Sequence, residues 1–371
     1  MTAPVIMQVH DLGSTSSRIM LNVGREFNPQ AIIMESEIIR TTLDCASSFH
    51  QSLIGRFNPA YSGWVELKGG CYCYGDAAKN LKAELQLGKS KFELAIPKIL
   101  ATTGAVSEEF NLPNGTTINL GVLLPYREYG DKDIFERFLR SYLQDFKFCG
   151  NHKSFNLNHF VCLPEISGVM LQAKVGKKTS NSNQIGLMLG FRDVSAVYVS
   201  KGSLSGGTSK DLGFHELCEF VGQKIAFHDY KQLAEAISRA GSKIYAKELQ
   251  PLLGNLNKTY RQAKLTQIKQ AIKEGRKNYL FAFDEWFKAN IRGEVDEVII
   301  AGGTAHYFRQ ELDAMLKKTS VSRINWCDEL EERIKSSFDS VIEQHSLHYR
   351  LSDVYGLFFY LWEYLSQNGD V

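Results

Sequence analysis

The sequence lacks the features that mark a membrane protein or an exported protein, and its net charge does not indicate a nucleic-acid binder. No apolar run approaches the ~18–20 residues that a membrane-spanning helix needs. The start, Met1–Pro4, has neither the basic nor the apolar region of a signal peptide, so we expect none. The formal net charge of +2 is too small to argue for nucleic acid by itself. With 44% hydrophobic and 23% charged residues, the chain fits an ordinary soluble protein, and we expect a cytoplasmic one.

The cysteines and prolines are few and carry no recognisable pattern. The seven cysteines include no CxxC pair. Cys71 and Cys73 alternate along an expected strand, but a zinc site would need a second pair at a suitable spacing. We therefore expect the reduced thiols of an intracellular protein. Only 8 prolines are present in 371 residues, none of them in a linker, and the whole chain is expected to fold.

Three glycine-bearing loops stand out in what the sequence does contain. They are Asp11–Arg18 (DLGSTSSR), Leu189–Asp193 (LGFRD) and Ala301–Ala305 (AGGTA). Each follows an aliphatic run that is typical of a buried strand. Glycines at strand ends let the backbone turn sharply, so that N–H groups can converge on a phosphate. The three loops together predict a nucleotide held between two halves of a molecule.

The order of the expected elements indicates a repeat. Each half begins with a strand, a glycine-containing turn and a second strand, and then continues into helices. Residues 210–290 are strongly helical and interrupt the second half. The expected strands are Val5–Val9, Ser17–Val23, Ala31–Ile39, Gly63–Leu67, Cys71–Tyr74, Thr116–Leu124, Asn158–Leu163, Ile185–Leu189, Ser195–Ser200 and Val295–Ile300. The expected helices outside 210–290 are Asn80–Glu84, Glu93–Thr102, Asp131–Phe148, Tyr307–Lys318 and Asp353–Leu365.

Five segments carry a resemblance to a known superfamily. Asp11–Arg18 resembles the first phosphate motif of the actin, Hsp70 and sugar-kinase superfamily, and Ile300–Ala305 resembles its adenosine motif. Tyr74–Ala78 is similar to a turn of actins, Leu163–Glu165 to a segment that carries a water-positioning glutamate, and Asp353–Gly356 to the second connector helix. The segments occur in the superfamily's order and span nearly the whole chain. Within the superfamily, the chain most resembles bacterial actins of the ParM type.

This resemblance implies an α/β, actin-like fold with two related domains. Each domain has a mixed β-sheet flanked by helices, and a nucleotide cleft lies between the domains. Domain I is expected at 1–165 plus about 340–371, and domain II at 166–339, with a helical insertion at about 208–290. The resemblance also implies ATP or GTP with Mg²⁺, assembly of the chain with itself into a cytoskeletal or DNA-segregation filament, and an adaptor protein that links the filament to DNA or the cell envelope.

The superfamily's roles can be transferred to individual positions. The resemblance implies nucleotide contacts from Gly13, Ser14, Thr15, Ser16, Arg18, Gly190, Arg192, Gly302, Gly303 and Thr304. Asp11 would hold Mg²⁺ through water, since this ion prefers carboxylates and keeps most of its hydration shell. Glu165 would position the attacking water, because phosphoryl transfer depends mainly on alignment and charge stabilisation. Glu165 could equally be a helix N-terminal residue that favours the helix dipole.

The second phosphate loop departs from the superfamily's pattern. Relatives carry an aspartate two residues before the glycine, where this chain has Met188. Methionine cannot hold a magnesium-bound water. Either Arg192 supplies charge to the phosphates while Asp193 partly replaces the missing carboxylate, or the protein binds nucleotide and hydrolyses it slowly. We expect slow hydrolysis, that is, a weak ATPase or GTPase.

A small-molecule kinase, for instance one acting on a sugar, is the alternative on the same fold. Such an enzyme needs a catalytic aspartate at the start of its second domain and a polar pocket for the sugar. Met188 and the actin-like turn Gly75–Ala77 argue against it. A monomeric chaperone-like ATPase is a third possibility, which is less favoured because we expect no separate peptide-binding domain.

Overall fold

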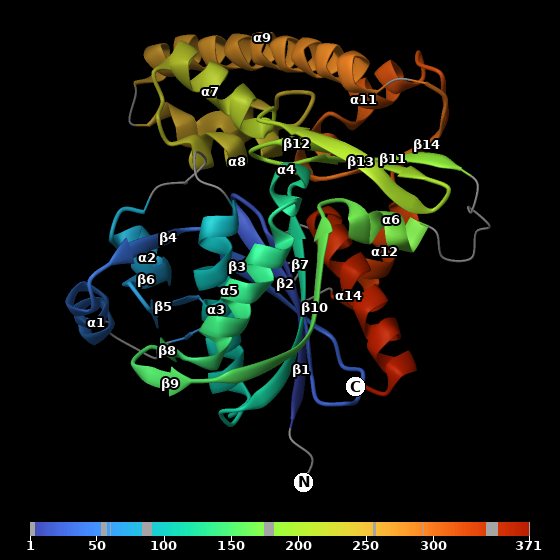
Figure 1. The fold of residues 1–371 in the computed structure, drawn as a ribbon. Helices are drawn as coiled ribbons and strands as arrows, with labels where there is room; N and C mark the ends of the chain where they lie inside the picture. Colours follow the sequence, from blue (N-terminus) through green and yellow to red (C-terminus); the bar gives the residue numbers. More distant parts are fainter. Residues whose placement is uncertain are drawn as a thin grey trace. The chain divides into compact units, whose positions relative to one another are not determined.

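The computed structural model describes residues 4–52, 58–59, 61–83, 91–173, 182–254, 257–291, 293–338 and 348–370. The chain forms two compact units (Figure 1). The first unit comprises Met1–Lys177 and Asp328–Val371, and the second comprises Lys178–Cys327. The second unit therefore begins after the predicted boundary at 166 and ends before the predicted boundary at 339. None of the described helices is both long and apolar enough to cross a membrane.

The central sheet of the first unit has five strands in the order β10-β7-β1-β2-β3. Strand β1 pairs antiparallel with β2 and parallel with β7, β2 pairs antiparallel with β3, and β7 pairs parallel with β10. The strands are β1 (Val5–Leu12), β2 (Ser16–Val23), β3 (Gln30–Glu35), β7 (Thr116–Leu124) and β10 (Phe155–Pro164). Both faces of β1 are buried, including its polar residues Gln8, His10 and Asp11.

A second five-stranded sheet in this unit has the order β4-β6-β5-β8-β9. Its members are β4 (Ile38–Thr41), β5 (Ser62–Leu67), β6 (Gly70–Gly75), β8 (Phe146–Phe148) and β9 (Asn151–Lys153). The helices α1 (Leu43–Ser52) and α2 (Asp76–Asn80) contact its strands β5 and β6.

Three expected elements in this unit were wrong in detail. The single strand expected over 31–39 is divided, because β3 pairs with β2 whereas β4 pairs with β6 in the other sheet. The helix expected over 131–148 ends at Gln144, because β8 pairs with β5. Asn80 ends α2 rather than beginning a helix, and residues 81–83 form a turn after it. In the first two cases a strand-pairing partner distant in sequence decides the local structure.

Helices cover both faces of the central sheet (Figure 1). The even-numbered side chains of β1 enter a core with α3 (Lys91–Glu109) and α5 (Lys132–Gln144). The odd-numbered side chains face α14 (His348–Asn368), where Leu357 lies over Val9 and Gly121. Strand β10 leads directly into α6 (Ser167–Ala173), which packs against α14. The remaining helices in the described part of this unit are α4 (Tyr126–Tyr129) and α12 (Asp328–Ser337).

Helices α6 and α14 cross at a pair of glycines. A Cβ atom added to Gly356 would overlap the carbonyl of Gly168, and one added to Gly168 would overlap the carbonyl of Asp353. The two backbones are therefore in direct contact, which only glycine permits at these positions. This crossing, together with the packing of α12 on α14, explains why residues 166–177 and 328–338 belong to the first unit.

The sheet of the second unit repeats the topology of the first. Its order is β13-β12-β11-β14-β15, with β11 antiparallel to β12, β12 antiparallel to β13, and β14 parallel to both β11 and β15. The strands are β11 (Asn183–Leu189), β12 (Val194–Ser200), β13 (Ser203–Lys210), β14 (Val295–Ala301) and β15 (Val321–Asn325). Strand for strand, this order corresponds to β3-β2-β1-β7-β10.

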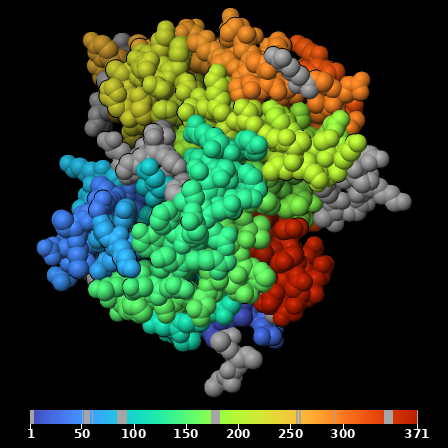
Figure 2. Space-filling view, in the orientation of Figure 1, coloured from blue at the N-terminus to red at the C-terminus, as the bar shows by residue number. Residues whose placement is uncertain are grey.

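Four helical segments lie between β13 and β14 in sequence. They are α7 (Phe214–Ile225), α8 (Tyr230–Ala240), the 3₁₀ segment η1 (Ala246–Leu253) and α9 (Lys258–Asn290). The orange side chains of α9 form an outer surface of this unit (Figure 2). The short helices α10 (Gly303–Tyr307) and α11 (Arg309–Leu316) follow β14.

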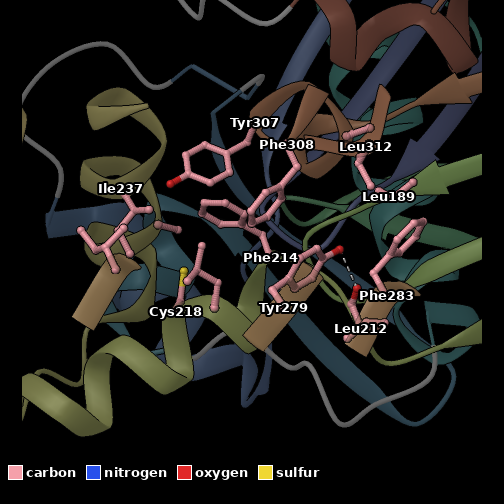
Figure 3. Packing of buried hydrophobic residues seen from close by; sticks show 14 of the residues in the cluster. Leu189, Leu212, Phe214, Cys218, Ile237, Tyr279, Phe283, Tyr307, Phe308 and Leu312 are labelled. Atoms are coloured by element: carbon pink, nitrogen blue, oxygen red, sulfur yellow. Dashed lines mark hydrogen bonds between the residues drawn. The ribbon is translucent and has the colours of Figure 1, made fainter. Parts of the chain in front are cut away.

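An aromatic core joins these helices to the sheet of the second unit (Figure 3). The rings of Tyr279 and Phe308 stack with their centroids 4.7 Å apart, and the rings of Phe214 and Tyr307 meet edge to face at 4.9 Å. The hydroxyl of the buried Tyr279 donates to the carbonyl of Leu212, so its polar atom is satisfied in the core. Residues of α7, α9 and α10 are thereby fixed relative to one another.

We expect Gly356→Ala to destabilise the first unit. Alanine favours a helix interior over glycine by about 1 kcal/mol, yet the added methyl group must displace the backbone of α6, and such overpacking costs about 1–3 kcal/mol. Urea unfolding followed by tryptophan fluorescence and circular dichroism measures the net effect. Gly130→Ala is the matched control, since nothing lies within 4 Å of a Cβ atom there. Equal stability of the two variants would contradict the close crossing.

Candidate functional site

The turn between β1 and β2 is built around one ion pair. Asp11 and Arg18 face each other across the two strands, and the Arg18 guanidinium donates to the carboxylate of Asp11. Both side chains are largely buried, at 7% and 13% exposure. Gly13 is required here, because a Cβ atom would overlap the Arg18 guanidinium and lie 2.7 Å from the carbonyl oxygen of Ser16. The D-x-G sequence at Asp11–Gly13 therefore forms a tight turn that packs directly against the Arg18 guanidinium.

Several polar atoms at this turn are buried without a hydrogen bond among the described residues. They are the hydroxyl oxygens of Ser16 and Ser17 and the Nε of Arg18. Ser14 and Thr15, at the tip of the turn, are partly exposed. A buried polar group without a partner costs free energy, so such groups often mark the place of a missing ligand or water. Hydroxyl and guanidinium donors fit an oxyanion, and this turn therefore fits the phosphate that the sequence predicts.

Glu165 lies at the same edge of the sheet as this turn. In the parallel register, Asp11 is beside Leu123 of β7, and Leu123 is beside Leu163 of β10. Glu165 follows two residues after Leu163 and is 5% exposed. Its backbone N–H donates to the carbonyl of Leu124 at 2.8 Å. The carboxyl ends of parallel strands are where open α/β sheets commonly bind ligands.

A third carboxylate, Asp353 of α14, completes this edge and was not singled out from the sequence. Its two oxygens accept the backbone N–H groups of Ile166, at 2.6 Å, and Val169, at 3.2 Å. Complete burial raises the pKa of Asp353 to about 8. The negative charges of Asp11 and Glu165 also raise this pKa, whereas the two N–H donors lower it. The carboxyl group of Asp353 thus lies within electrostatic reach of Asp11 and Glu165.

The corresponding turn of the second unit is organised differently. Arg192 and Asp193, between β11 and β12, are both buried and form an ion pair with an Nη2–Oδ2 distance of 2.9 Å. The backbone N–H of Gly190 donates to the carbonyl of Asp193. A cation that pairs with a buried carboxylate has its charge offset locally. The charge of Arg192 therefore has a partner within its own turn.

The Gly302–Thr304 segment packs directly on this second turn. Thr304 Oγ1 donates to the carbonyl of Gly190 at 2.6 Å, and the same carbonyl accepts the N–H of Phe214. Gly302 has φ +107, and a Cβ atom there would overlap the carbonyl of Leu189. Only glycine tolerates both conditions. Gly303 begins α10 next to it.

The predicted site residues therefore fall into two groups, one in each unit. Asp11, Gly13, Ser14, Thr15, Ser16, Arg18 and Glu165 share one sheet edge of the first unit, and Gly190, Arg192, Gly302, Gly303 and Thr304 share one of the second. Met188 lies beside Ala301 in the parallel register of β11 and β14. Over the described part of the chain, no group of three or more His, Cys, Asp or Glu side chains could hold a metal ion by itself. A cation at Asp11 would need ligands from elsewhere.

Comparison with known proteins gives matches to solved structures alone, since no family model and no curated protein sequence matches the chain. The archaeal actin homologue Ta0583 superposes with a TM-score of 0.61 at 13% identity, over 98% of this chain and 99% of Ta0583. The psk41 ParM protein gives 0.58 at 12% identity, over 98% of both chains. Alp12 in its filament gives 0.54 at 14% identity, over 96% of this chain and 98% of Alp12. Ta0583 has also been solved in complex with ADP, a match with a TM-score of 0.53 at 14% identity over 86% of this chain and 92% of Ta0583.

These matches define the class of the fold. The chain has the actin-like fold of the bacterial and archaeal actin homologues, with mixed sheets flanked by helices. The resemblance inferred from the sequence motifs is thus confirmed for the fold across nearly the full chain. At 12–14% identity, the matches leave the chemistry to be argued from this chain's own residues.

We expect Asp353 to make stability depend on pH in a specific direction. Its pKa is near 3.8 when unfolded and about 8 when folded, so the folded state holds a proton that the unfolded state releases. The contribution of Asp353 to the free energy of unfolding is complete below pH 4. It is lost as the pH rises toward 8, by at most about 1.4 kcal/mol per pH unit. Urea unfolding of wild type and Asp353→Asn from pH 4 to 8 measures this loss. A stability difference between the two that stays constant across this range would contradict the raised pKa.

Proposed function

We propose that the protein is a nucleotide-dependent, filament-forming actin homologue that binds ATP or GTP with Mg²⁺ and hydrolyses it slowly. The observation that carries this proposal is the β1–β2 turn. There, the buried hydroxyls of Ser16 and Ser17 and the Nε of Arg18 have no hydrogen-bond partner among the described residues, at the sheet edge where the sequence motif predicts phosphate. The actin-like fold and the ADP complex of Ta0583 support it.

In this proposal the first unit holds the phosphates. The hydroxyls of Ser16 and Ser17 and the backbone of Ser14 and Thr15 donate to phosphate oxygens. Mg²⁺, when bound, offsets the negative charge of the phosphates and orders water around them. Asp11 would hold that hydrated ion, which in turn would release Arg18 from its ion pair toward the phosphates. Binding would therefore replace the Asp11–Arg18 ion pair by two contacts, one between Asp11 and the hydrated Mg²⁺ and one between Arg18 and the phosphates.

The second unit would contribute the adenosine motif and a weak phosphate loop. Gly302, Gly303 and Thr304 present backbone with no Cβ atom in the way of a nucleoside. Met188 supplies no carboxylate, and Arg192 is already paired with Asp193. The second turn would thus bind the phosphates less well than the loop of relatives does, and slow turnover follows. Glu165 would be the residue that positions the attacking water.

Assembly is the expected use of the nucleotide. A ligand that contacts both units favours the arrangement in which both sets of contacts form, and so it can favour one subunit-docking state. The structural relatives include the filament of Alp12. We propose the chain itself as the main partner, in a cytoplasmic filament, with an adaptor that links it to DNA or the cell envelope.

High-speed pelleting with and without ATP, GTP or a non-hydrolysable analogue, with phosphate release followed in parallel, tests this function. We expect nucleotide-dependent pelleting with little phosphate released. Protein that stays in the supernatant under every condition would refute the filament. A phosphate release that requires an added sugar would favour the small-molecule kinase.

The phosphate-binding turn can be tested separately with Ser16→Ala. A hydrogen bond to a charged group contributes about 1.5–3 kcal/mol. We therefore expect the dissociation constant of a fluorescent ATP or GTP analogue to rise roughly 10- to 100-fold. Ser107→Ala is the matched control, because Ser107 also has a buried, unpartnered hydroxyl but lies on α3. Equal affinities of the two variants would place the phosphates elsewhere.

Met188→Asp should increase hydrolysis. The new carboxylate would lie on β11 beside Ala301, where relatives have their aspartate. We expect single-turnover phosphate release to rise about 10-fold or more, the scale of a correctly placed acid–base or water-orienting group. Met188→Leu controls for the loss of sulfur. Unchanged phosphate release in Met188→Asp would show that the methionine does not limit turnover.

A further inference from the structure

The segment that follows β10 is held by a side chain from the far end of the sequence. Ile166 and Val169 donate their N–H groups to the carboxyl group of Asp353, which is 2% exposed. These are donors at the start of α6, which intrahelical bonds cannot satisfy. Asp353 therefore acts as a capping residue that comes from α14 rather than from the chain next to α6.

The capped segment is also strained. Ile166 has φ +77, a conformation that a β-branched residue adopts only when its surroundings enforce it. Its side chain is completely buried and its N–H bond to Asp353 is short, at 2.6 Å. The surroundings that enforce the strain thus include Asp353 itself.

The residue immediately before this strained position is Glu165. Its own N–H is fixed by the carbonyl of Leu124, so the peptide groups on both sides of Glu165 are held by hydrogen bonds. Asp353 can exert this hold because Gly168 and Gly356 bring the two helix backbones into contact. The direction of the Glu165 side chain is therefore set jointly by β7 and α14.

We propose that Asp353 is a positioning residue for Glu165, holding it in the orientation in which it aligns the attacking water. The inference rests on the proposed function, since it gives Asp353 a part in the same hydrolysis. Asp353 would not touch the nucleotide. It would act through the Ile166 and Val169 peptide groups, which turn the chain after Glu165.

The test combines Asp353→Ala with Glu165→Gln in a double-mutant cycle. We expect Asp353→Ala to lower kcat for ATP or GTP hydrolysis about 10-fold or more, the scale on which a misplaced group affects catalysis. The dissociation constant of a non-hydrolysable analogue should change by less than about threefold, because the phosphate-binding turn is intact. In the Glu165→Gln background, Asp353→Ala should have no further effect on kcat.

Two further variants make the result decisive. Ser352→Ala removes a buried hydroxyl that donates to the carbonyl of Tyr349 in its own helix, and it should leave kcat unchanged. Asp353→Asn keeps one acceptor oxygen, should lower kcat less than alanine does, and carries the same cycle if the alanine variant does not fold. Losses that multiply with Glu165→Gln, or that appear equally in kcat and in nucleotide affinity, would overturn the positioning role.

The same experiment distinguishes a failure of the positioning role from a failure of the proposed function. A wild type that neither binds nor hydrolyses nucleotide removes the proposed function and the role of Asp353 with it. A wild type that hydrolyses nucleotide while Asp353→Ala retains full kcat leaves the proposed function intact and refutes only the positioning role.

Discussion

The contact between α6 and α14 is the constraint on which the first unit's sheet edge depends. Two glycines let the helix backbones touch, and at that contact Asp353 reaches the turn that follows β10. A bulkier residue at either glycine would separate the helices and withdraw the carboxyl group from the N–H groups it accepts. One steric condition thus determines both the packing of the sheet's α14 face and the conformation next to Glu165.

The repeated sheet explains why the candidate residues occur in two groups with similar geometry and different chemistry. In each unit the turn between the first two strands lies at the carboxyl end of a parallel pair, so both turns receive polar residues from a neighbouring strand end. In the first unit, the hydroxyls of Ser16 and Ser17 and the Nε of Arg18 have no hydrogen-bond partner in the part of the chain that the structure describes. In the second, the buried charges pair within the turn itself. The same topology therefore carries two turns whose buried polar groups are satisfied to different extents.

The fold was largely predictable from the sequence, because its motifs sit at strand ends and several of its strands are rich in aliphatic residues. The division of residues 31–39 between two sheets could not be predicted, since the choice of partner strand is a contact over long sequence distance. The pairing of Arg192 with Asp193 was likewise invisible, because adjacent charges in a sequence do not reveal whether they face each other. Asp353 was read only as part of a connector motif. An aspartate next to the apolar, aromatic stretch 354–362 was the signal that could have identified it.

The first unit is assembled from both ends of the chain, and this has a consequence for its biosynthesis. Residues 1–177 leave the ribosome early, but the face of β1 that α14 covers stays open until residues 348–368 have emerged. The second unit, which is continuous in sequence, has all its strands and helices by residue 327. Folding on the ribosome would thus finish the second unit before the first, and the first would expose apolar sheet surface throughout that interval. Truncation near the C-terminus would therefore leave a protein prone to aggregation rather than a shorter folded one.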